Sequence, residues 1–98
     1  MSDKYNYYLN LIFSSVKDLN KQQPPESKLK IKKNELLIAE KSNLDSLGLV
    51  TLLIIIEDKI KKDLNKKIVL VNDKLISVEN TPFKTIDSLA RWLVKNVK

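Results

Sequence analysis

Two serines of this chain occur in the same local sequence, each with aspartate before it and leucine after it. One triplet spans residues 45–47 and the other spans residues 87–89. A serine in the first turn of a helix lies beside unpaired backbone N–H groups and the positive end of the helix dipole, which both favour an attached phosphate. Ser46 is therefore a candidate attachment site for a phosphodiester-linked group. Its local sequence fits a plain N-cap equally well, worth about 1 kcal/mol.

Position in the chain separates the two serines. Ser88 is followed by only ten residues, which leaves no room for a bundle beyond it. We interpret Ser88 as an ordinary polar residue in the first turn of the last helix. Ser46 has helical sequence and a long loop before it and more helical sequence after it.

The composition argues against self-contained catalysis. The 98 residues include no cysteine, which excludes disulfides, thiolate metal sites and cysteine nucleophiles. They also include no histidine, which removes the commonest general base and metal ligand. We expect a protein that is not an enzyme, with no catalytic residues and no metal site.

The charge and hydropathy limit the class of partner. The net charge of +6 would suit nucleic acid, but the lysines are spread along the chain and interleaved with acidic and apolar residues. We expect a solvated basic surface and no nucleic-acid partner. The longest apolar run, residues 47–56, falls short of the ~20 residues of a membrane span. Since the N-terminus lacks the pattern of a secretory signal, we expect a cytoplasmic monomer with no stable membrane insertion.

Hydrophobic periodicity predicts a helix over residues 3–20, because apolar residues recur there at steps of three and four. The proline pair at 24–25 ends this pattern. Residues 26–45 form a long connection that is rich in lysine but contains several aliphatic residues. A loop of that length needs anchoring by its own side chains or a function. The alternation at 29–33 suggests a strand, but no partner strand is evident, so we interpret the segment as an anchored loop.

A central helix is predicted to begin with Asp45 or Ser46 as its cap and to run to about Asn65. Its inward face is predicted to comprise Leu52, Leu53, Ile56 and Ile60. Three further apolar residues lie on another strip at helical spacing and are expected to stay exposed as a docking surface, namely Leu47, Val50 and Ile54.

The C-terminal third has weaker signals until its last helix. Residues 66–83 are rich in β-branched and turn residues. A strand over 68–71 is one interpretation, and a buried crossing loop followed by a brief helix is the one that we favour. Thr85 is predicted to cap a final helix, whose apolar face comprises Ile86, Leu89, Ala90, Leu93 and Val97, with Trp92 alongside.

The segment LDSLGLVTLLIIIEDKI resembles the signature of acyl carrier proteins, in which Asp-Ser-Leu opens the second helix. Asp45, Ser46 and Leu47 match that triplet. The segment TPFKTIDSLARWL resembles the short third helix and the capped fourth helix of the family, so the likeness covers nearly the whole chain. It implies an all-α fold with one domain over residues 1–98. That fold is a four-helix acyl-carrier-like bundle with three longer helices, one short helix III and a long loop between helices I and II.

The resemblance implies a function in lipid metabolism or a related pathway. Ser46 would carry 4'-phosphopantetheine, attached covalently from coenzyme A, and acyl intermediates would travel on this arm as thioesters. Implied partners are a phosphopantetheinyl transferase using coenzyme A and magnesium, an acyl-activating ligase or ketosynthase, and a downstream acyltransferase. Besides the apolar strip, Glu57 and Asp58 would supply acidic contacts to these enzymes.

Three positions depart from the family pattern. Asn43 replaces a frequent glycine, and Gly48 and Thr51 stand where acidic residues are common. Fatty acid biosynthesis in general commonly uses an acidic carrier, so this basic chain predicts a dedicated lipid or secondary-metabolite pathway.

Other functions remain open at this level. A peptidyl or aminoacyl carrier, including a D-alanyl carrier, has the same architecture. A basic helical nucleic-acid-binding module would need a basic, polar second helix, whereas this one is mainly apolar. An unmodified interaction or scaffold domain would keep the same bundle.

Overall fold

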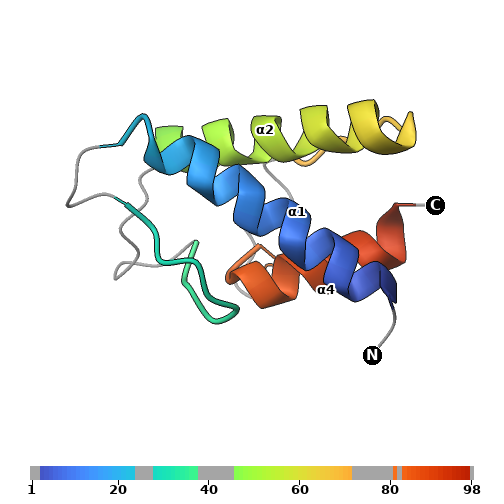
Figure 1. The fold of residues 1–98 in the computed structure, drawn as a ribbon, viewed down its shortest axis with the longest axis horizontal. Helices are drawn as coiled ribbons and strands as arrows, with labels where there is room; N and C mark the ends of the chain where they lie inside the picture. Colours follow the sequence, from blue (N-terminus) through green and yellow to red (C-terminus); the bar gives the residue numbers. More distant parts are fainter. Residues whose placement is uncertain (1–2, 24–27, 38–45, 72–80, 82, 98) are drawn as a thin grey trace.

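The computed structural model describes residues 3–23, 28–37, 46–71, 81 and 83–97, and all statements below concern these residues. They form a compact all-helical fold with three helices: α1 (Asp3–Asn20), α2 (Ser46–Leu64) and α4 (Ile86–Asn96). Helix α1 packs against both α2 and α4 (Figure 1). The predicted all-α class and the long loop between the first two helices are confirmed.

The predicted brief helix after residue 65 falls largely on residues outside the described ones, namely 72–80 and 82. The described residues on either side, 66–71 and 83–85, are not helical. The finer prediction of a four-helix bundle therefore stays a prediction.

The ends of the helices follow from local signals. Helix α1 begins and ends where the periodicity predicts, and a turn follows in which Gln22 N–H donates to the Leu19 carbonyl at 2.9 Å. Helix α2 ends at Leu64, and it is followed by Asn65, whose φ of 53° is left-handed and whose N–H donates to the Lys61 carbonyl at 2.9 Å. Asparagine tolerates this conformation better than most residues, so it serves as a helix C-cap here.

The core lies where the three helices meet. The predicted inward residues of α2 and the predicted apolar face of α4 are all buried, which confirms both. Helix α1 adds its own stripe, and Phe83 packs edge-on against Trp92 with ring centroids 5.3 Å apart. The fully buried large side chains are Ile12, Leu19, Leu37, Leu52, Leu53, Ile56, Ile60, Leu70, Phe83, Ile86, Leu89 and Leu93.

The described part of the long loop is anchored, as the sequence predicts. The Asn20 side chain donates to the Leu29 carbonyl and accepts from the Leu29 N–H, both at 2.9 Å. Leu29 and Leu37 are buried. Residues 29–33 form no strand, and the β-pairing between the described part of this loop and the start of α4 is limited to an isolated bridge between Leu36 and Thr85. Burial of two leucines, rather than a sheet, therefore positions the described loop.

The start of α4 is held by its cap and by the loop together. Thr85 Oγ1 accepts from Ser88 N–H at 3.1 Å, and Ser88 Oγ accepts from Thr85 N–H at 3.0 Å, which is a capping box. The next two donors bind loop carbonyls: Ile86 N–H donates to Glu35 and Asp87 N–H donates to Lys33. The first-turn N–H groups that a helix leaves unpaired are thus satisfied here.

Among the helices described, none has the length and apolar character that crossing a membrane requires.

Candidate functional site

Ser46 is the first residue of α2. The first turn of this helix contains no acidic residue. The backbone N–H groups and the positive end of the helix dipole would attract a phosphate attached to Ser46. No side-chain carboxylate within that turn would repel it. Asp45 and Asn43, which the resemblance also implicates, lie outside the described residues.

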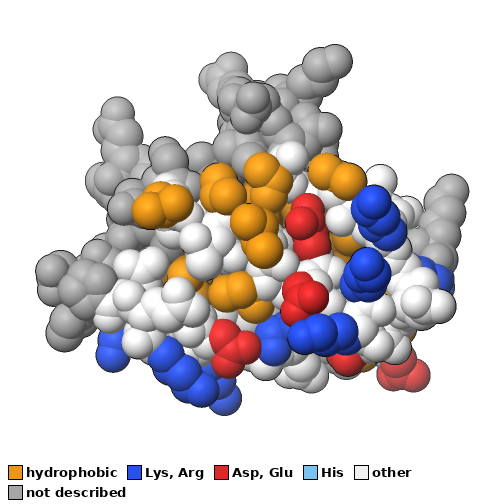
Figure 2. Space-filling model, turned by 90° about the horizontal axis from the view of Figure 1, so that it is seen from above, with side chains coloured by type: hydrophobic (Ala, Val, Ile, Leu, Met, Phe, Trp, Pro, Cys, Tyr) orange, Lys and Arg blue, Asp and Glu red, His pale blue; other side chains and the backbone are white. Residues whose placement is uncertain are grey.

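The apolar strip predicted on α2 is largely confirmed as an exposed surface. Leu47 exposes 75% of its surface and Ile54 exposes 52%, whereas Val50 is half-buried rather than exposed. At 3.6 residues per turn, Val50 lies closer around the helix to the buried Leu49 and Leu53 than the other two residues of the strip do, which explains its partial burial. Figure 2 shows hydrophobic side chains gathered over α2 on this face, with acidic side chains next to them and basic ones toward the C-terminal end of the helix.

Gly48 and Thr51 stand where the acyl carrier signature is often acidic, and neither adds a charge to α2. Gly48 is buried. Thr51 is half-buried, and its hydroxyl donates to the Leu47 carbonyl at 2.8 Å. The first half of α2 is therefore uncharged over its described surface.

The two acidic residues predicted to contact partners differ in their surroundings. Glu57 is half-buried, and its Oε2 accepts from Leu70 N–H at 2.5 Å and from Val71 N–H at 3.3 Å. Asp58 is exposed and pairs with Lys62 at 3.0 Å. Glu57 thus holds the segment after α2 against the helix, a role that the sequence analysis did not foresee.

The segment held by Glu57 widens the apolar surface. Leu70 is fully buried, while Val69 and Val71 are exposed on either side of it. These valines, with Ile68 and Ile54, line a groove of roughly 440 Å³ between α2 and residues 67–71. The sequence analysis missed this surface, although the richness of this segment in β-branched residues is the signal for which it considered a strand there.

The second triplet has no comparable setting. The Ser88 hydroxyl accepts from Thr85 N–H and lies 3.0 Å from the Thr85 carbonyl, to which it donates. Leu89 is fully buried. The interpretation of Ser88 as a structural residue of the first turn of α4 is therefore confirmed.

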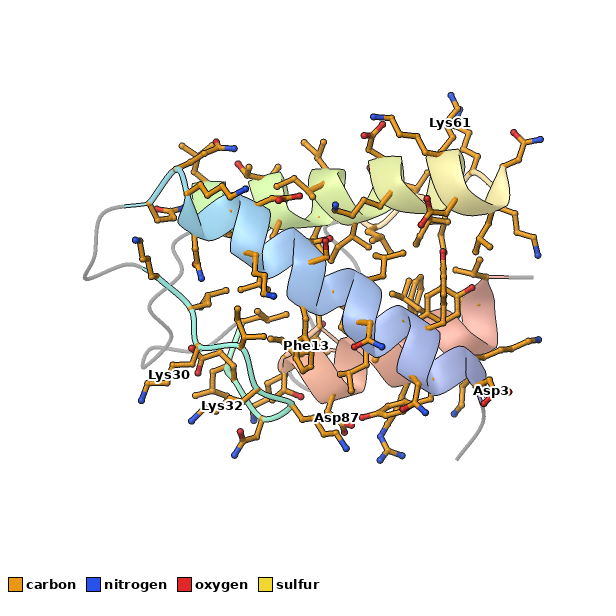
Figure 3. The ribbon with its side chains drawn as sticks, in the orientation of Figure 1. Asp3, Phe13, Lys30, Lys32, Lys61 and Asp87 are labelled. Carbon is orange, nitrogen blue, oxygen red and sulfur yellow. The ribbon has the colours of Figure 1, made fainter. Side chains whose placement is uncertain are left out.

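Asp87 of the same triplet is also committed to the fold. It accepts hydrogen bonds from the Tyr5 hydroxyl and from Arg91 Nε, the latter at 2.9 Å. The Tyr5 hydrogen bond, followed by the guanidinium of Arg91, lowers the pKa of the Asp87 carboxyl below its usual value. Arg91 and Lys33 also lie over the Tyr5 ring, at 5.5 and 5.7 Å from its centroid. In Figure 3, Asp87 lies on the side of the molecule opposite α2.

A wider hollow of roughly 670 Å³ lies between α1 and α2 and is lined mainly by polar groups. Several of these groups pair with each other across the two helices. Lys59 pairs with Asp18 at 2.9 Å, and the Tyr7 hydroxyl donates to Asp63 at 3.1 Å. The hydrogen bond from Lys59 lowers the pKa of Asp18. These contacts join α1 to α2, and we assign them a structural role.

Comparison of the chain with protein-family models, with curated proteins and with solved structures finds no match.

Proposed function

We propose that this protein is an acyl carrier: Ser46 bears a 4'-phosphopantetheine arm, and acyl groups travel on its thiol as thioesters between enzymes of a dedicated lipid or secondary-metabolite pathway. The observation that carries the proposal is the contrast between the two serines. Ser46 begins the central helix beside a leucine that is 75% exposed, whereas the hydroxyl of Ser88 is hydrogen-bonded within the cap of α4.

The residues around Ser46 suit the arm. A phosphodiester on Ser46 would lie at the positive end of α2, and the first turn holds no carboxylate to repel it. When bound, the arm supplies a terminal thiol that forms the thioester. The chain's own residues anchor the phosphate and present the surface on which enzymes dock, and the chemistry belongs to those enzymes.

The exposed face of α2 supports contact with proteins. Leu47 and Ile54 are apolar and exposed, and exposed apolar clusters commonly mark interaction sites. Recognition of base edges would instead need polar and basic side chains at these positions. We therefore assign Leu47, Val50 and Ile54 to the docking of the transferase that loads the arm and of the ligase, ketosynthase or acyltransferase that uses it.

Intact-mass measurement tests the proposal directly. The chain is co-expressed with a broad-specificity phosphopantetheinyl transferase, and the wild type is expected to gain the mass of one phosphopantetheine group. Ser46→Ala is expected to lose this gain completely. Ser88→Ala is the matched control, since it changes the other serine of the same triplet, and it should load normally. A wild type that is not loaded, or a gain lost in Ser88→Ala instead, would refute the carrier assignment.

A further inference from the structure

The groove between α2 and residues 67–71 combines an apolar centre with a charged rim. Its apolar lining comprises Ile54, Ile68, Val69 and Val71, and Val69 exposes 58% of its surface. Lys61 and Lys67 border it. Figure 3 shows Lys61 pointing away from the body of the molecule on the outer side of α2. Such a surface offers burial to apolar side chains and attraction to anions at its edge.

The charged residues that line the groove differ in whether a partner among the described residues already engages them. Glu57 accepts two backbone hydrogen bonds from Leu70 and Val71, and Asp58 pairs with Lys62. Lys61 and Lys67 are exposed and have no ion-pair partner among the described residues. Among the described residues, the charge that remains for a ligand is therefore positive, in keeping with the net charge of +6.

We infer that this groove binds an acidic amphipathic helix of a partner protein, with apolar side chains in the groove and carboxylates beside Lys61 and Lys67. A helix laid in an apolar groove is a recurring mode of recognition. The inference rests on the proposed function, because the groove shares Ile54 with the docking strip. It also specifies the partner, which presents acidic rather than basic residues to this face.

Two other occupants fit the observations less well. A second copy of the chain would bring together two molecules that each carry +6, and their repulsion opposes association. Attraction to an anionic membrane is worth only about 1 kcal/mol for each lysine near its surface. The binding free energy from the groove's two lysines is therefore too small for stable attachment. A concave groove also suits a ridge of side chains better than a flat surface.

The experiment uses two synthetic helical peptides and the unmodified protein. Both peptides carry a leucine ridge at positions i, i+4 and i+7, flanked by glutamate in one peptide and by lysine in the other. Fluorescence anisotropy is expected to show that the wild type binds the glutamate peptide at least about tenfold more tightly than the lysine peptide. Amide NMR shifts are expected at Ile54 and across residues 67–71.

Charge reversal provides the decisive comparison. The double variant Lys61→Glu with Lys67→Glu should prefer the lysine peptide. Lys84→Glu with Lys95→Glu makes the same change in net charge at exposed positions that do not line the groove, and it should keep the wild-type preference. Val69→Ser should weaken binding of the glutamate peptide several-fold without changing the preference.

The outcomes are distinct from those of the loading test. Ser46→Ala should bind the glutamate peptide as tightly as the wild type, so failure of the carrier proposal leaves this result intact. The inference is overturned if neither peptide binds, if both bind equally, or if the Lys84 and Lys95 variant also reverses the preference. Binding to phosphatidylserine vesicles without a peptide preference would assign the surface to membranes instead.

Discussion

The triplets at 45–47 and 87–89 have the same sequence, but their leucines lie in opposite environments. Leu47 exposes 75% of its surface, whereas Leu89 is completely buried. The serines of both triplets lie in the first turn of a helix. Leu89 is buried because α4 packs on α1 and because the loop at 33–37 pairs with the first turn of α4. An identical local sequence can therefore place a leucine on the exposed surface in one part of the chain and in the core in another.

The largest expected difference in stability between the triplets concerns the leucines. Leu89→Ala should lower the free energy of unfolding by about 2–5 kcal/mol, because it leaves a cavity in the core. Leu47→Ala should change it by no more than about 0.5 kcal/mol, as is usual for an exposed side chain. Urea denaturation followed by circular dichroism measures both. A similar loss in the two variants would contradict the assignment of Leu47 to the surface.

The serines should differ by a smaller amount. Ser88→Ala removes half of a capping box and should lower the free energy of unfolding by about 1 kcal/mol. Ser46→Ala should have an effect below about 0.5 kcal/mol, because α2 begins at Ser46 and alanine is favourable within a helix. Thermal and urea denaturation of the unmodified variants checks this. A loss of about 1 kcal/mol for Ser46→Ala would identify Ser46 as the cap of α2.

The aspartate of the second triplet should make stability depend on pH. Folding lowers the pKa of Asp87. Its contribution to the free energy of unfolding is therefore complete above the unfolded-state pKa of about 3.9. This contribution is lost as the pH falls through the folded-state pKa. Asp87→Asn should cost about 1 kcal/mol at neutral pH, a modest value for a partly exposed group, and less in acid.

Urea denaturation across a pH series tests this role of Asp87. Tyr5→Phe should reproduce part of the loss, since it removes the hydrogen bond that lowers the Asp87 pKa most. Asp58→Asn is the control, because Asp58 forms an ion pair of the same i,i+4 spacing with Lys62 but has no tyrosine partner among the described residues. Equal losses in Asp58→Asn and Asp87→Asn would show that Tyr5 adds nothing to the pair.

The smallest effect concerns the net charge of the chain and follows from the proposed carrier function. A fatty-acid-synthesis enzyme with a basic carrier-binding site should acylate this holo-protein more slowly than an acidic carrier, because the chain carries a net charge of +6 and the enzyme's site is also positive. Salt screens exposed charges beyond about 10 Å at 0.1 M, so added salt should raise the rate here by a few-fold and lower it for the acidic carrier. Equal rates with the same downward dependence on salt would contradict the expectation.

Much of the candidate site could be predicted from the sequence, but its extent could not. Periodicity placed Leu47 and Ile54 on one strip and the core residues of α2 on another, since that separation depends only on helical geometry. Glu57 was expected to contact partners, but its carboxylate binds the backbone of Leu70 and Val71. Glu57 is thirteen positions from Leu70 and fourteen from Val71. These contacts depend on how the chain turns after Asn65, which hydrophobic periodicity does not predict.

The sequence by itself determined the helices: the spacing of apolar residues, the proline pair after α1, Asn65 after α2 and Thr85 before α4 are local signals that act within a few residues. Only the tertiary structure decided which of the two leucines, Leu47 or Leu89, is buried, how the loop at 33–37 completes the start of α4, and how residues 67–71 form a groove with α2. Burial is the physical reason, because it depends on which surfaces the folded chain brings together, and identical triplets meet different surfaces.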